Sequence, residues 1–251
     1  MKTTIYYFSA TGNSMTTAEI LAEELGAKLI PVASTKHMPK VTEEADAVGF
    51  VFPVYYGDMP YPVREMIAKM VFKPESYIFI CTTQRGHAGA APKRMDQLLH
   101  TRGQKLSLAV GVNMPGNSFI NPPEVDAEYL LKQKENVLAL VPQIQNRTAE
   151  DYSTTEVLPM APVASPNNFR GIEAEESCIG CGTCVKVCPM ENIVLENGRA
   201  KIGADCATCL ACFHWCPTES IWMSGQENIA RRSKYHHPDV TAEKIAAQKT
   251  E

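Results

Sequence analysis

The stretch TTIYYFSATGNS, residues 3–14, decides the fold of the first half of the chain. Its apolar run Thr3–Phe8 predicts a β-strand, and a helical pattern begins at Ser14. Between them, Gly12 and small hydroxyl residues allow a tight turn, and the free amides at the helix start attract an anion such as phosphate. The loop lacks the further glycines of a dinucleotide fingerprint and the lysine of a triphosphate loop, so it suits one terminal phosphate. An ordinary Ser/Thr helix cap is the alternative.

Strand and helix patterns continue to alternate up to about residue 147. The sequence therefore predicts an α/β domain with a doubly wound, five-stranded parallel sheet, and strands that are apolar on both faces imply helices on each side. The segment between the second and third strands, residues 34–45, is too short for more than a stunted helix. The further predicted strands are Ala27–Val32, Ala47–Phe52, Tyr77–Cys81 and Leu106–Val112, and the predicted helices are Ser14–Leu25, Tyr61–Val71, Ala90–Arg102 and Glu124–Arg147.

The composition divides the chain into four parts. Residues 1–147 form the α/β domain, and residues 148–172, rich in Ser, Thr, Pro and Asn, are predicted to be a linker. Residues 173–223 are a cysteine-rich module that is too small for a large core and depends on metal for stability. Residues 224–251 begin with a basic patch (Arg231, Arg232, Lys234) and end in a helix-like run, Val240–Gln248. We expect this last part to be a solvated or loosely docked tail.

The cysteine-rich module contains the same pattern twice: three cysteines at Cys-x2-Cys-x2-Cys spacing, then three residues and a Cys-Pro pair. Three thiolates at this spacing surround one iron–sulfur cube, and the fourth cysteine ligates the other cube. The sequence thus assigns one [4Fe–4S] cluster to Cys178, Cys181, Cys184 and Cys216, and a second to Cys206, Cys209, Cys212 and Cys188. Small residues between the ligands let backbone amides approach the sulfur atoms. Zinc or disulfides are the alternative, but zinc sites usually close with widely separated cysteine pairs.

The net charge, the N-terminus and the cysteine count indicate which partners and which compartment to expect. A formal net charge of −4 and the lack of a basic arm argue against a nucleic-acid partner. We expect a cytoplasmic protein, because the N-terminus does not resemble a signal peptide and no apolar stretch is long enough for a membrane span. Thiols are kept reduced there, which favours metal ligands over disulfides for the nine cysteines. Cys81, at the end of an apolar strand, is predicted to be a buried structural thiol.

The cysteine module resembles the bacterial-type two-cluster ferredoxins, and the first loop and sheet resemble the flavodoxins, which form an FMN phosphate loop much like Ser-x-Thr-Gly-Asn-Ser. Low-potential one-electron transfer at each cluster is implied by the first resemblance. The second implies that FMN binds and that its phosphate contacts Ser9, Thr11, Gly12, Asn13 and Ser14. His214 and Trp215 depart from the ferredoxin pattern, which often has smaller residues there. His214 is expected to pack or lie on the surface, since all eight ligand positions are filled.

The flavin ring is expected at the carboxyl ends of the strands, where the loops after the third and fourth strands meet. Either Tyr55 or Tyr56 stacks on the ring in this hypothesis, with core packing as the alternative for one of them, and Gly57 turns its peptide toward N5. Arg85 or His87 offsets charge near N1, unless they serve only the surface. The candidate ring contacts are Pro53, Val54, Tyr55, Tyr56, Gly57, Thr82, Thr83, Gln84, Arg85, Gly86, His87 and Gly89.

The two domains together resemble the flavodoxin–ferredoxin fusion proteins of anaerobes. This resemblance implies an electron-transfer iron–sulfur flavoprotein that relays low-potential electrons between two [4Fe–4S] clusters and FMN. Its partner would be a redox protein or a small-molecule electron acceptor, and a homodimer is an open alternative. Two other functions stay open: an FMN-dependent reductase of a small molecule, with His87, Tyr55 and Tyr56 as candidate proton donors, and a ferredoxin whose first domain is a docking module without FMN.

Overall fold

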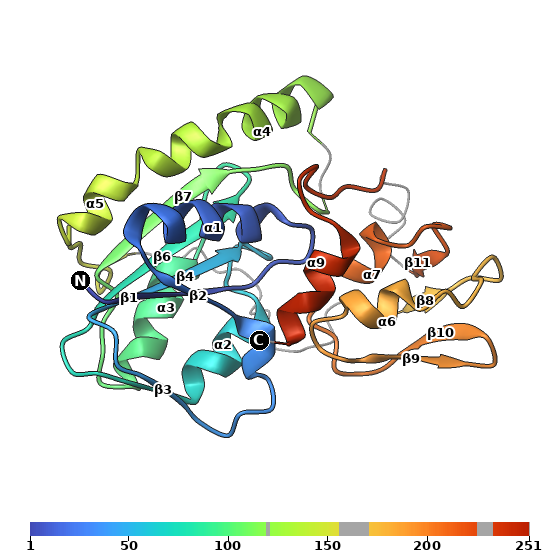
Figure 1. The fold of residues 1–251 in the computed structure, drawn as a ribbon, viewed down its shortest axis with the longest axis horizontal. Coiled ribbons are helices and arrows are strands. Elements are labelled where there is room, and N and C mark those ends of the chain that lie inside the picture. Colours follow the sequence, from blue (N-terminus) through green and yellow to red (C-terminus); the bar gives the residue numbers. More distant parts are fainter. Residues whose placement is uncertain (119–120, 156–170, 225–232, 251) are drawn as a thin grey trace.

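Five parallel strands form the central sheet in the computed structural model, which describes residues 1–118, 121–155, 171–224 and 233–250 (Figure 1). Their order across the sheet is β2-β1-β4-β6-β7. The chain starts near the middle, moves outward to β2, and then returns past β1 toward the other edge, so the predicted doubly wound sheet is confirmed. The strands are β1 (Thr3–Tyr7), β2 (Lys28–Pro31), β4 (Ala47–Pro53), β6 (Tyr77–Gln84) and β7 (Leu108–Asn113).

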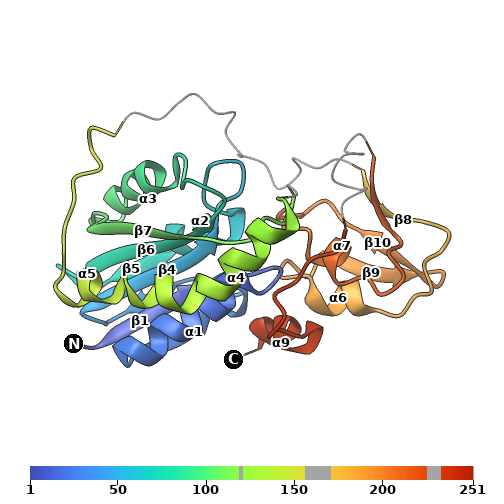
Figure 2. The ribbon, with the colours of Figure 1, turned by 90° about the horizontal axis from the view of Figure 1, so that it is seen from above.

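Helices cover both faces of this sheet, as Figure 2 shows. On one face lie α1 (Asn13–Leu25), α4 (Pro123–Leu138) and α5 (Val141–Gln145), and on the other lie α2 (Tyr61–Ala68) and α3 (Ala91–His100). The strands between them are apolar on both sides for this reason, and Ile78, Phe79 and Ile80 of β6 are completely buried. Within the described ranges, no helix has the length and apolar character needed to cross a bilayer.

Two predicted elements differ in detail. The sequence predicted one helix over 124–147, but the structure ends α4 at Leu138 and begins α5 at Val141, because Pro142 fits only the first turn of a new helix. The segment 34–45 is a 3₁₀ turn, η1 (Val32–Thr35), followed by the short strand β3 (Val41–Glu43). This strand pairs in parallel with β5 (Met70–Phe72), which takes the end of the predicted helix 61–71.

The cysteine-rich part contains two short helices and two antiparallel strand pairs. The hairpin of β9 (Ile193–Glu196) and β10 (Arg199–Ile202) turns at Asn197 and Gly198, which both have positive φ, as a two-residue hairpin turn requires. The second pair is β8 (Ile172–Ala174) with β11 (Ile221–Met223). The helices are α6 (Thr183–Val187) and α7 (Ala211–His214). Phe213, completely buried, lies at the centre of this small core.

The last described segment packs on the rest of the chain, unlike the loosely docked tail that the sequence predicted. It contains α9 (Ala242–Ala246) and the 3₁₀ turn η2 (Ala247–Lys249), near the predicted helix 240–248. In Figure 1 this red segment lies between α6 and the central sheet. Val240 and Ile245 are buried in the core of the first half. Most of the predicted linker, residues 156–170, and Arg231 and Arg232 of the basic patch lie outside the described residues.

The packing of β4 against β6 gives a first test. A methyl group on Gly49 would lie 2.3 Å from Cζ of Phe79, which is completely buried, so Gly49→Ala should lower the free energy of unfolding by about 1–3 kcal/mol. Urea unfolding followed by circular dichroism measures this. Shortening the ring in the double variant Gly49→Ala, Phe79→Leu should make the two effects less than additive. Additive losses would contradict the proposed clash.

Candidate functional site

A cleft of about 330 Å³ lies at the carboxyl edge of the central sheet. The loops after β1, β4, β6 and β7 form most of its walls, and Thr208 and Leu210 from the second cysteine loop form the rest. Parallel strands bring their carboxyl ends to one edge, so these separate loops meet there. The cleft is therefore shared between the two halves of the chain.

Most of the residues predicted to hold a flavin line this cleft. Four do not. Gly12 packs against the C-terminal segment, Thr82 bonds to Gln84 within the sheet, Gly86 donates its N–H to Asn113, and Gly89 lies against Gly57. Those that line the cleft are Ser9, Thr11, Asn13, Ser14, Pro53, Val54, Tyr55, Tyr56, Gly57, Thr83, Gln84, Arg85 and His87.

The first loop has the geometry of an anion site. Gly12 is the N-cap of α1 with φ of 105°, a left-handed conformation that favours glycine, and no side chain caps the helix. Its N–H is bonded to Oγ of Ser9 at 3.1 Å, which tightens the turn. The hydroxyls of Ser14 and Thr83 lie 2.7 Å apart, joining the loop to β6. The first-turn amides of α1 have no acceptor within the helix, so a phosphate fits here.

A buried carboxylate fixes the loop that carries the two tyrosines. Asp58 is completely buried and accepts from Nη2 of Arg64 at 2.7 Å, from Arg94, and from the N–H of Met59. Just before it, Tyr56 and Gly57 have φ of 51° and 70°. Asp58 therefore fixes the buried side of this turn, and the other side of the turn faces the cleft.

Tyr55 and Tyr56 have different surroundings. Tyr55 is buried and lies edge-on to Phe8, whereas Tyr56 is 42% exposed. Burial raises the pKa of Tyr55 well above its ordinary value, and the nearby Cys209 raises it further. Burial, and after it the nearby Cys206, also raises the pKa of Tyr56. Both phenols are neutral at physiological pH, and both lie beside the second cysteine loop.

Sequence reasoning missed one wall of the cleft. Asn117, in the loop after β7, donates from Nδ2 to the carbonyl of Cys209 at 3.1 Å and to the hydroxyl of Tyr55 at 3.4 Å. The Tyr55 hydroxyl also donates to the Cys209 carbonyl at 3.4 Å. The fifth strand ends at the same sheet edge, so its following residues, 114–118, could have been added by the rule used for the third and fourth strands. Nothing local in the sequence indicated the contact with residues 208–210.

The cysteines gather into two groups, each of which takes its fourth member from the other repeat. Cys178, Cys181, Cys184 and Cys216 line one hollow. Burial, followed by the charges of its three partners in this group, raises the pKa of Cys184 to about 11. In the other group, burial and then Cys209, Cys188 and Cys206 raise the pKa of Cys212. Thiols that oppose each other's ionisation in this way suit a cationic centre that binds them as thiolates.

Backbone amides point at several of these sulfur atoms. The N–H groups of Thr208 and Ser220 donate to Cys206 and Cys216, at 3.4 and 3.3 Å, and the N–H of Asn192 donates to Cys188 at 3.4 Å. Such bonds stabilise the negative charge of an iron–sulfur cluster. Among the described residues, no three His, Cys, Asp or Glu side chains converge tightly enough to hold a single metal ion.

The two groups face different surroundings. The group of Cys188, Cys206, Cys209 and Cys212 adjoins the cleft through the loop that contains Thr208 and Leu210. The first group lies nearer the solvent, since Cys181 is exposed and its neighbour Ile179 is 67% exposed. One group is thus internal and the other is accessible from outside.

Models of two protein families match two separate parts of the chain. Residues 4–119 match the model of a flavodoxin domain, and residues 165–221 match the model of a 4Fe-4S dicluster domain. Ferredoxin-2 of Desulfomicrobium norvegicum is 60% identical over 25 residues, which are 10% of this chain and 42% of that protein. The chain therefore spans less than half the length of this relative.

Solved structures resemble the first half at low sequence identity. A flavodoxin of Streptococcus pneumoniae is 18% identical, with a TM-score of 0.34, and the match covers 55% of this chain and 99% of that one. An azoreductase of Bacillus anthracis is 11% identical, with a TM-score of 0.40, and the match covers 57% and 100%. The domain assignment rests on the two family matches.

The grouping of the cysteines predicts which cluster each variant damages. On the ligand assignment predicted from the sequence, Cys216→Ala should remove a ligand from the cluster of Cys178, Cys181 and Cys184 and spare the other, because Cys216 lines the same hollow as these three cysteines. Electron paramagnetic resonance of the reduced protein and iron analysis measure the loss. Cys81→Ala is the matched control, because Cys81 is buried in β6, away from both groups. Loss of the Cys206–Cys212 cluster instead would contradict the assignment.

Proposed function

Because the chain joins a flavodoxin domain to a 4Fe-4S dicluster domain, as in a flavodoxin–ferredoxin fusion, we propose that it relays low-potential electrons between two [4Fe–4S] clusters and FMN. The two domain matches support an iron–sulfur flavoprotein of electron transfer. The proposal adds the number of clusters, the identity of the flavin, the ligands and the route.

One observation carries this proposal: the second cysteine loop is itself a wall of the cleft. Thr208 and Leu210 line it, and the carbonyl between them, that of Cys209, accepts hydrogen bonds from Asn117 and Tyr55. A ring held between the tyrosine loop and this wall would be in contact with the residues that flank a cluster ligand. No movement of one domain toward the other would be needed.

When bound, the clusters would supply one-electron transfer and the flavin would supply one- or two-electron chemistry. The chain's own residues position and shield these groups. Ser9, Thr11, Asn13 and Ser14 would hold the phosphate, with Gly12 allowing the turn. Asp58 keeps the tyrosine loop in place, and the buried Tyr55 closes the floor of the cleft against water.

The loop after β1 favours FMN over a dinucleotide. It offers one set of helix amides and hydroxyls, which matches one terminal phosphate, and it lacks the glycines with which a dinucleotide fold approaches a pyrophosphate. Mass spectrometry of the flavin released from an anaerobic preparation should therefore give FMN. Finding FAD, or no flavin at all, would overturn this part of the proposal.

The exposed group of cysteines is the proposed contact with the redox partner. Cys181 and Ile179 are exposed there, and Glu173, Glu175 and Glu176 lie exposed shortly before Cys178. Acidic side chains favour a basic redox protein, whose association would weaken as salt screens the attraction. Electrons would then enter or leave at the Cys178 group and cross the Cys206 group to the cleft.

A reductase of a small molecule is the second candidate. The observation in its favour is that Tyr55, Tyr56 and His87, the candidate proton donors, all line the cleft. The ring nitrogen Nδ1 of His87 accepts from the N–H of Gly89 at 3.1 Å, so the proton of the neutral ring lies on Nε2. Steady turnover of a small acceptor that falls strongly in His87→Ala, with flavin content unchanged, would favour this function over the relay.

The relay is tested by removing the internal cluster. In Cys206→Ser, Cys209→Ser, a limiting low-potential donor should reduce the flavin at least tenfold more slowly than in the unaltered protein, because the proposed route passes through this group. Stopped-flow absorbance under anaerobic conditions follows both centres. Cys81→Ser again serves as the control. Equally fast flavin reduction in the double variant would mean that the clusters do not feed the flavin.

A further inference from the structure

The described C-terminal segment, residues 233–250, is here called the strap. We propose that the strap is a working part of the flavin site: it shapes the phosphate loop from behind, with His237 as its positioning residue. This inference rests on the proposed function, since it concerns the loop that would hold the FMN phosphate. It gives a role to a segment that the sequence predicted to be a loosely docked tail.

The strap bonds to two backbone carbonyls before Gly12 and to the side chain just after it. The N–H of His237 donates to the carbonyl of Thr11 at 2.7 Å, and Nε2 of Gln248 donates to the carbonyl of Ser9 at 3.0 Å. The hydroxyl of Tyr235 donates to Oδ1 of Asn13 at 2.6 Å. With its carbonyls held from behind, the loop can turn its amides toward the cleft.

The strap packs so closely on Gly12 that no side chain would fit at this position. A methyl group on Gly12 would lie 2.7 Å from Cβ of His237 and 2.9 Å from Cγ2 of Val240. The strap residues are buried by this contact, since His237 is 4% and Val240 is 3% exposed. The glycine of the phosphate loop is therefore needed for close packing as well as for its positive φ.

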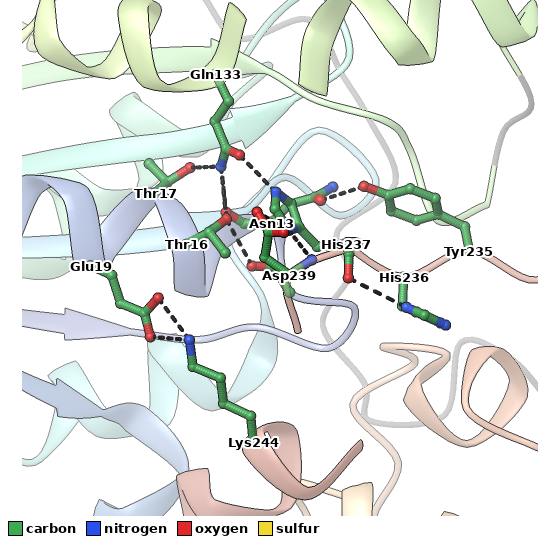
Figure 3. A network of polar contacts seen from close by, with 11 residues as sticks. Asn13, Thr16, Thr17, Glu19, Gln133, Tyr235, His236, His237, Asp239 and Lys244 are labelled. Atoms are coloured by element: carbon green, nitrogen blue, oxygen red, sulfur yellow. Dashed lines mark hydrogen bonds and ion pairs between the residues drawn. The ribbon is translucent and has the colours of Figure 1, made fainter. Parts of the chain in front are cut away.

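His237 joins the loop to α4 through a buried chain of hydrogen bonds (Figure 3). Its Nδ1 accepts from the N–H of Asp239 at 3.2 Å, so the neutral ring carries its proton on Nε2 and donates to Oε1 of Gln133 at 2.8 Å. Gln133, in turn, donates from Nε2 to Oγ1 of Thr16 and of Thr17, at 2.8 and 3.0 Å. This chain holds the first turns of α1 against α4.

The strap acts through the loop rather than on the ligand. None of the described residues that line the cleft belongs to the strap. Its hydrogen bonds to the α/β domain reach residues 9–19 and Gln133, at the phosphate end of the site, and none of those described reaches the loops after β4 and β6, where the ring is expected. Its other hydrogen bonds and ring contacts fall on the cysteine module, at Val185 and at residues 213–215. Loss of the strap contacts should therefore weaken binding of FMN and leave riboflavin, which has the same ring without phosphate, almost unaffected.

The test compares the two flavins in the full-length protein. Flavin-depleted protein that retains its iron is titrated anaerobically with FMN and with riboflavin, and the quenching of flavin fluorescence gives both dissociation constants. His237→Ala should weaken FMN binding about tenfold and change riboflavin binding less than twofold, because it removes the side-chain bond to Gln133 that helps to hold the first turns of α1 and leaves the loops after β4 and β6 untouched. His237→Gln, whose amide can still donate to Gln133, should recover most of the loss.

Two further variants keep the result interpretable. Tyr235→Phe deletes one hydroxyl and should weaken FMN binding about threefold, even if His237→Ala fails to fold as judged by iron content and circular dichroism. His100→Ala is the matched control, because His100 is exposed at the end of α3 on the opposite face of the sheet. It should bind both flavins normally.

The outcomes separate this inference from the proposed function. If the unaltered protein binds FMN and the folded strap variants bind it equally well, the strap has no role in the site. Equal losses for FMN and riboflavin would also overturn the inference, because the strap would then support the whole fold rather than the phosphate loop. If the unaltered protein binds no flavin, the proposed function fails first, and the inference fails with it.

Discussion

The carbonyl of Cys209, held by Asn117 and Tyr55, is the contact on which the shared cleft depends. A buried carbonyl needs a donor, and both donors come from loops at the carboxyl edge of the sheet. The second cysteine loop is therefore fixed against the cleft, and the other group of cysteines is left toward the solvent. His214 strengthens the same contact, since its Nε2 lies 2.7 Å from the carbonyl of Asn117 and its Nδ1 accepts from the N–H of Tyr235.

The sequence predicted those features that depend on local pattern. Apolar runs located all five strands of the main sheet, and the positive φ of Gly12 agrees with the turn expected from the loop. The repeat of the cysteines predicted their grouping, which the hollow around Cys216 supports. The strap and the wall at Thr208 were not predicted, because each depends on a partner far away in the chain. Nothing near Gly12 indicates that His237 will pack on it.

Further contacts couple the second cysteine loop to the loop after β1. Trp215, next to Cys216, donates from Nε1 to the carbonyl of Ala10 at 2.9 Å and stacks on His236 of the strap. A cysteine module of this size has little core of its own and gains much of its stability from bound metal. An ordered conformation of the cysteine loops therefore favours an ordered conformation of residues 9–14. The reverse holds as well, because such coupling is reciprocal.

A second set of contacts, away from the cleft, argues that the cysteine module does not rotate relative to the α/β domain. Lys36 donates to the carbonyl of Met190, and Nε2 of His37 lies 2.5 Å from Oε2 of Glu191, which joins the segment after β2 to the cysteine module. Together with the Cys209 contact and the strap, they hold the module at separate points. Exposed ion pairs contribute little alone, but several attachments at different edges restrict rotation as well as separation. The proposed relay therefore needs a diffusing partner only at the outer cysteine group, while transfer toward the cleft occurs across a contact that is already formed.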